Sequence, residues 1–187
     1  CSSKAPLWGN IKSMSNLYIY FLNVLIIALP LALFEIVTEK DKGWGSGWSK
    51  SKWYAKPFAP KSSLVRFLTK ILNIEHPLVY HFIVFAVIIP AIFIFEYFYL
   101  TKDILLLLAS FIGVIALEDF LWFLLNWNFD SRRQLLKGPN GTIWWHKRWI
   151  KISKNTYLPA SYSAFLLSLL LLILSLWEGT TVSWIWR

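Results

Sequence analysis

The sequence predicts an all-α integral membrane protein in which four transmembrane helices form a bundle with two long interfacial connections on the cytoplasmic side. Three observations support this fold class: 57% of the 187 residues are hydrophobic, four apolar segments are long, and Lys and Arg gather between them. At 1.5 Å per residue, about 20 apolar residues cross the roughly 30 Å hydrocarbon layer. We therefore expect one polytopic membrane domain over residues 1–187.

Four segments have the length and apolar character of transmembrane helices, at about residues 17–38, 77–99, 104–127 and 159–177. Four crossings place both termini on one side of the membrane and both long connections on the other. The fourth segment is Leu-rich and carries no acidic or basic side chain, so we expect it to serve as a packing helix.

Lys and Arg are distributed unevenly along the chain. Fifteen of the 19 lie in the two connections, eight in residues 40–75 and seven in residues 128–157. The positive-inside rule then predicts an inner or plasma membrane protein with cytoplasmic connections and both termini outside. Trp beside Lys and Arg is typical of a membrane interface, with aromatic belts, so lipid is the expected partner and nucleic acid is not.

Single residues predict how the helices pack. Pro90 predicts a kink in the second segment, and the lone amide of Asn23 predicts a hydrogen bond between helices. Ala109 and Gly113 form a small-xxx-small step that lets another helix approach closely. We expect Glu96, near the outer face, to reach water.

The most informative feature is a pair of adjacent acids, Glu118 and Asp119, within the third apolar segment. A charge near the centre of a membrane helix costs roughly 2.5 to 3.5 kcal/mol on insertion scales, so the pair requires a partner, a metal, water or protonation. Glu118 shares a helical stripe with Trp122 and Asn126, whereas Asp119 lies about 100° round the helix. Glu118 should therefore face a pocket, and Asp119 should be held by a neighbouring helix.

Topology brings further polar residues to the level of the acid pair. The first segment ends, the second begins and the third ends on the same side, so Glu35, His81, Glu118 and Asp119 are expected to converge. Carboxylates and imidazoles are suitable ligands for a divalent metal such as iron, manganese or zinc. The same groups could instead transfer protons. No Glu-x-x-His, His-x-x-x-His or His-Glu-x-x-His motif favours the metal.

The second connection contains His146 among Trp, Lys and Arg. The sequence leaves open whether this histidine is a residue of the interface or belongs to an active site. Basic side chains near it would attract an anionic headgroup. The candidates for binding a substrate headgroup are Arg133, Arg148 and Asn126.

The preferred hypothesis is a membrane-embedded enzyme, metal-dependent if the acids hold an ion, that acts on a lipid or isoprenoid-like anionic amphiphile. The predicted catalytic residues are Glu118, Asp119 and His146, and the predicted metal ligands are Glu35, His81, Glu118 and Asp119. The alternative is a small transporter, or a proton-conducting or accessory subunit of a membrane complex, in which the same acids relay protons. The sequence does not decide whether the protein is an enzyme. It also does not decide whether the protein forms a homo-oligomer or is a subunit of a complex.

Overall fold

The structure of the protein is a computed structural model, and the residues that it describes are 7–40, 43, 51–56, 78–128, 130, 136–141, 143, 146 and 148–185. The described chain is mostly helical. Its longer elements are α1 (Leu7–Glu39), α3 (Val79–Ile83), α4 (Ile89–Tyr99), α5 (Ile104–Leu125) and α7 (Ser163–Ile185). A π-helix, η2 (Val84–Ile88), joins α3 to α4 without a break.

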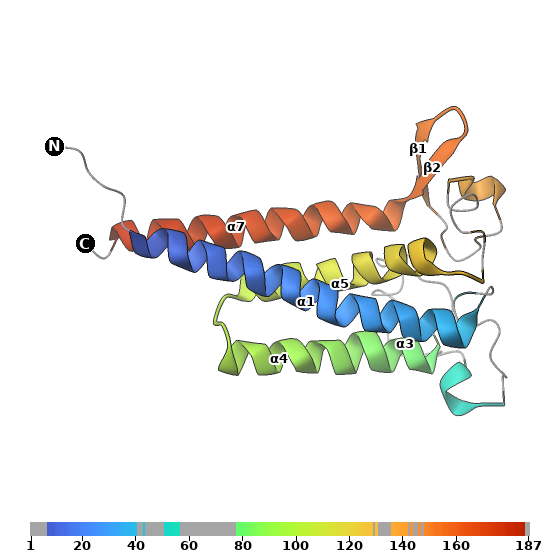
Figure 1. The fold of residues 1–187 in the computed structure, drawn as a ribbon, viewed down its shortest axis with the longest axis horizontal. Helices are drawn as coiled ribbons and strands as arrows, with labels where there is room; N and C mark the ends of the chain where they lie inside the picture. The colour runs from blue at the N-terminus through green and yellow to red at the C-terminus, as the bar shows by residue number, and fades with distance from the viewer. Residues whose placement is uncertain are drawn as a thin grey trace, which may run out of the picture.

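Four stretches of helix are long and apolar enough to cross a membrane: Met14–Glu39, Val79–Tyr99, Ile104–Leu125 and Ala160–Trp177. Their bounds agree with the predicted segments to within a few residues. The prediction of a mostly helical chain with four helices of membrane-spanning length is therefore confirmed. The helices lie side by side in Figure 1, where α1 begins and α7 ends at one end of the bundle. We call the opposite end, where α1 and α5 end and α3 and α7 begin, the connection end.

The second apolar segment departs from an ideal α-helix just before Pro90, over the five residues of η2. Pro90 has no N–H to donate, so the preceding turn can widen at little cost. At 100° per residue, His81 and Glu96 would differ in facing by about 60° on an ideal helix. The wider turn reduces that difference, and both side chains are buried.

Helices α1, α5 and α7 pack closely at Gly113, as the small-xxx-small step predicts. A Cβ at this position would lie 2.9 Å from Ser168 Oγ of α7. It would also lie 3.0 Å from both Tyr20 Oη and Val24 Cγ2 of α1. The missing side chain therefore lets three helices meet at one point.

Gly113→Ala should lower the free energy of unfolding by about 1 to 3 kcal/mol, because the added methyl group overpacks this crossing. Alanine's better helix propensity, worth about 1 kcal/mol in a water-exposed helix, offsets only part of that loss. Thermal unfolding in detergent checks the prediction, with Leu108→Ala on the exposed face of α5 as the control. A Gly113→Ala protein as stable as the wild type would contradict the packing described here.

Hydrogen bonds link the helices in the half of the bundle away from the connections. Asn23 Nδ2 donates to Glu96 Oε2 at 2.7 Å, which confirms the hydrogen bond predicted for Asn23. The expectation that Glu96 reaches water is wrong, since its side chain is buried against this amide. Asp103 caps α5 through Leu106 N and also accepts a 2.7 Å hydrogen bond from Ser175 Oγ.

The connection end includes a β-hairpin that the all-α prediction did not anticipate. Strands β1 (Trp149–Ser153) and β2 (Thr156–Pro159) pair antiparallel and lead through the 3-10 turn η4 (Ala160–Tyr162) into α7. Ala160 N donates to Arg148 O at 2.8 Å, which closes the base of the hairpin. His146 lies near the start of α7, with its ring centroid 6.2 Å from that of Tyr162.

Candidate functional site

Acidic and imidazole side chains from three helices gather at the connection end of the bundle. Glu35 and Glu39 lie in the last turns of α1, His81 lies in α3, and Glu118 lies in α5. Their exposed fractions are 7%, 2%, 3% and 5%, so all four are buried. The structure brings Glu35, His81 and Glu118 together, as the topology predicts. Their roles as metal ligands or catalytic groups stay predictions.

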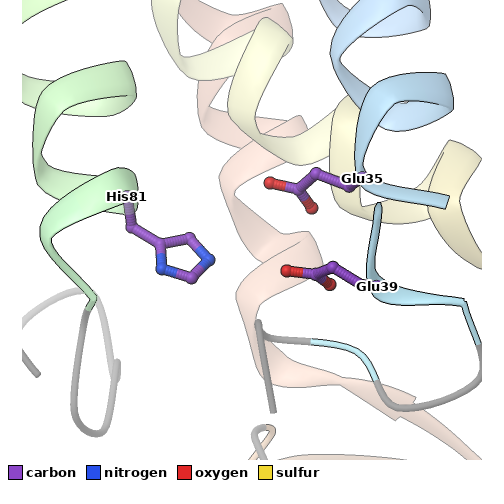
Figure 2. Close-up of side chains that lie close together, drawn as sticks. All are labelled: Glu35, Glu39 and His81. Carbon is purple, nitrogen blue, oxygen red and sulfur yellow. The ribbon is translucent and has the colours of Figure 1, made fainter. Parts of the chain in front are cut away.

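One group has the dimensions of a metal site. Glu35, Glu39 and His81 each offer a ligand atom, and these atoms all lie within 4.8 Å of one another. Figure 2 shows the two carboxylates projecting from α1 toward the imidazole of His81 across the gap to α3. Small side-chain rotations would bring these atoms to the roughly 2.0 to 2.2 Å that a zinc ion requires of nitrogen and oxygen ligands.

The two ring nitrogens of His81 face different groups. Nδ1 accepts a long hydrogen bond of 3.3 Å from the N–H of Leu78, just before α3. The edge of the ring that carries Nε2 points toward Glu35 and Glu39 (Figure 2). Metal binding through Nε2 would move the ring proton to Nδ1, so the bond from Leu78 would be lost at about 0.5 to 1.5 kcal/mol.

Glu118 joins this group through Glu35. The two carboxyl groups lie close enough to share a hydrogen bond. Glu118 Oε1 receives no hydrogen bond from any described residue, while Glu35 Oε1 accepts one of 3.2 Å from Tyr80 Oη. Two facing carboxylates in an apolar layer repel each other, so a proton or a cation must compensate them.

Asp119 points to a different partner, as its position round the helix predicts. Its Oδ2 lies 3.3 Å from His146 Nε2. This partner comes from the second connection, and Tyr162, at the start of the fourth helical span, also lies within hydrogen-bond reach of Asp119. Aromatic rings of Phe123, Trp149 and Tyr162 surround the imidazole, with centroids 5.7 to 6.2 Å away.

The three residues predicted to bind a headgroup differ in position. Asn126 is buried and uses both polar atoms of its side chain, since Nδ2 donates to Lys40 O at 2.7 Å and Oδ1 accepts from Asn128 N. This bond fastens the end of α1 to the end of α5. Arg148 is exposed beside the hairpin, and Arg133 lies outside the described residues. Headgroup binding by these residues stays a prediction.

Sequence reasoning omitted Glu39, Tyr80 and Tyr162 from the site. Glu39 follows Glu35 at i+4 and so shares its face, which was a usable signal. Tyr80 orients Glu35, and Tyr162 packs against the ring of His146. Neither tyrosine stands out in a sequence with eight tyrosines and many aromatic residues.

Apolar segments of α1 and α5 separate these groups from the polar residues toward the other end of the bundle. No polar residue lies between Asn23 and Glu35 of α1 or between Ser110 and Glu118 of α5. Asn23 and Glu35 are 12 positions, or about 18 Å, apart along α1.

The chain matches no protein-family model, no curated protein and no solved structure.

Proposed function

We propose that the protein is an integral membrane enzyme that binds a divalent metal at the connection end of its bundle and acts there on a lipid-like amphiphile. The observation that carries the proposal is the buried group of Glu35, Glu39 and His81, with ligand atoms within 4.8 Å of one another. Glu118, next to Glu35, supplies a fourth donor. Buried acids at membrane depth are functional by default.

Placement in a membrane is supported by the outer faces of the four helices. Large apolar side chains are exposed there, such as Phe21, Ile26, Ile94 and Leu166. Exposed apolar surface on this scale marks contact with lipid or another protein. A substrate dissolved in the bilayer could reach the connection end along these faces, which favours an amphiphile over a soluble metabolite.

The donor set limits the choice of metal. Carboxylate oxygens and imidazole nitrogens together suit iron, manganese or zinc, and the single Cys excludes a thiolate-based zinc site. The metal would act as a Lewis acid or as a redox centre, depending on its identity. Arg148 and the other basic residues of the connections would attract an anionic headgroup.

The orientation in the membrane follows from charge. Because 15 of the 19 Lys and Arg residues lie in the connections, these segments should face the cytoplasm. In a Cys1→Ser background, cysteines introduced at Ser46 and Lys137 should react with a membrane-impermeant thiol reagent only from the cytoplasmic side. A cysteine at Ser183 should react only from the outside. Labelling of positions 137 and 183 from the same side would contradict the four-crossing topology.

Metal content tests the function directly. Protein purified in detergent without chelators should carry iron, manganese or zinc in stoichiometric amount, and His81→Ala should lower that content at least tenfold. Glu96→Gln is the matched control, since Glu96 is also a buried membrane carboxylate but lies 2.7 Å from Asn23 in the other half of the bundle. Metal-free wild-type protein that carries a potential-driven proton flux would instead favour the transporter hypothesis. The apolar middle of the helices weighs against that flux.

A further inference from the structure

We propose that the connection end holds a second catalytic centre, a serine–histidine–aspartate relay that hydrolyses acyl esters of membrane amphiphiles. Ser161 is the nucleophile, His146 takes its proton, and Asp119 positions His146. The three side chains are joined by two contacts that do not involve the carboxylates and imidazole of the metal group. The relay needs no metal, so this inference goes beyond the proposed function and is tested separately from it.

The two ring nitrogens of His146 connect a hydroxyl group to a carboxylate. Ser161 Oγ lies 3.4 Å from Nδ1, and Asp119 Oδ2 lies 3.3 Å from Nε2. A nucleophile within hydrogen-bond reach of a base that a third group orients is the signature of an activated nucleophile. Such contacts are often long before substrate binds and tighten in the substrate complex. Relays of this kind are recognised by their geometry and not by the order of the residues in the chain.

The ion pair with Asp119 favours the tautomer of His146 that the relay requires. With the ring proton on Nε2, next to the carboxylate, Nδ1 keeps a lone pair that can accept the proton of Ser161 Oγ. The imidazolium formed by this transfer is stabilised by the charge of Asp119. The hydroxyl group of Tyr162 lies within hydrogen-bond reach of the same carboxylate. Asp119 is therefore a positioning residue, whereas Ser161 and His146 are catalytic residues.

The exposure of the three side chains suits these roles. Ser161 is exposed, whereas the side chains of His146 and Asp119 are 10% and 26% exposed. Three aromatic rings surround the imidazole, with centroids 5.7 to 6.2 Å away, and limit its movement. A substrate can thus reach the hydroxyl group while the base stays in place.

The position of Ser161 indicates the class of substrate. The fourth helical span begins at Ala160, so Ser161 lies in its first turn, where the polar connection meets the apolar helix. The ester groups of acyl lipids lie at this boundary between the headgroups and the hydrocarbon layer. Exposed apolar side chains of α7, such as Leu166 and Leu170, follow from this point and would contact the acyl chain.

The reaction balances with water as the only co-reactant. Ser161 Oγ forms a bond to the carbonyl carbon of the ester, and its proton passes to His146 Nδ1. The N–H of Ser161, in the first turn of the helical span, has no acceptor within the helix and can stabilise the oxyanion. The bond from the carbonyl carbon to the alcohol oxygen then breaks, and the alcohol leaves with the proton. Water hydrolyses the acyl-serine by the same proton transfers and releases the acid.

An alkyl fluorophosphonate, from which an activated serine displaces fluoride, tests the nucleophile. The full chain in detergent should be labelled at Ser161, as located by peptide mass spectrometry, and should hydrolyse para-nitrophenyl octanoate. Ser161→Ala should lose both properties. Ser163→Ala is the matched control and should retain both, because Ser163 is also exposed and its Oγ donates to Ala160 O at 2.7 Å.

Two further variants test the base and the residue that positions it. His146→Ala should slow labelling of Ser161 by about 10²- to 10⁴-fold, the usual contribution of a general base, and added imidazole should restore part of the rate. Asp119→Asn should lower kcat about tenfold or more with little change in KM, because the amide does not stabilise the imidazolium. Folded His146→Ala protein that is labelled as fast as the wild type would overturn the relay.

Chelation separates the relay from the metal centre. Wild-type protein stripped of metal by a chelator should still be labelled at Ser161. Folded, metal-bound wild-type protein without a label on Ser161 would overturn the relay and leave the proposed function standing. Protein that is labelled at Ser161 but binds no iron, manganese or zinc would support the relay and overturn the proposed metal centre.

Discussion

A strong chelator should lower the thermal unfolding temperature of the purified protein by about 5 to 10 °C. A ligand that binds only the folded state at 100 times its dissociation constant stabilises that state by about 2.7 kcal/mol. For chains of 150 to 250 residues, each kcal/mol corresponds to roughly 2 to 4 °C.

Two variants serve as controls for chelation, one at the connection end of the bundle and one at the opposite end. His81→Gln removes an imidazole from the site, so its unfolding temperature should not respond to the chelator. Glu96→Gln alters only the carboxyl group bound to Asn23 and should respond as the wild type does. A wild-type protein whose unfolding temperature is unchanged by the chelator would show that no metal stabilises the fold.

Glu118→Gln should abolish metal binding and activity while the protein still inserts and folds. The amide is nearly the same size as the carboxyl group, but it carries no charge and is a poor metal ligand. A buried amide is also less costly than a buried charge, and it removes one of two facing carboxylates. The metal-free variant should therefore be at least as stable as metal-free wild-type protein.

Metal analysis and thermal unfolding of the same Glu118→Gln sample separate a functional from a structural role. Loss of metal from a folded protein supports the functional role. A stabilised protein that keeps its full metal content would remove Glu118 from the site and leave it a structural acid. Glu96→Gln, at 7% exposed, again provides a buried carboxylate for comparison.

The helices were predictable from the sequence because each one is a long apolar run, and length against bilayer thickness is a strong constraint. Two features were not. Helix α1 starts at Leu7, although residues 7–16 are too polar to be read as part of a membrane span. The β-hairpin has strands of five and four residues, whose short alternating pattern lies inside a basic and aromatic stretch that also fits an interfacial segment.

The part of the candidate site that depends on the order and direction of the helices was predictable. The order of the segments places Glu35, His81 and Glu118 at one level, and helical facing separates Glu118 from Asp119. The i+4 spacing places Glu39 on the face of Glu35, but spacing alone does not show that this helix end is buried. Which segment covers that end depends on tertiary packing, and so does the contact between Asp119 and His146, which are 27 positions apart. Periodicity carries no information about such contacts.

The most direct test of a metal centre at the connection end is an experimental structure with anomalous scattering measured at the iron, manganese and zinc absorption edges. A metal centre there should give a strong anomalous peak about 2.0 to 2.3 Å from Glu39 and from His81 Nε2, with Glu35 and Glu118 beside it. Density for water alone between these side chains, with no anomalous signal in protein purified without chelators, would contradict it.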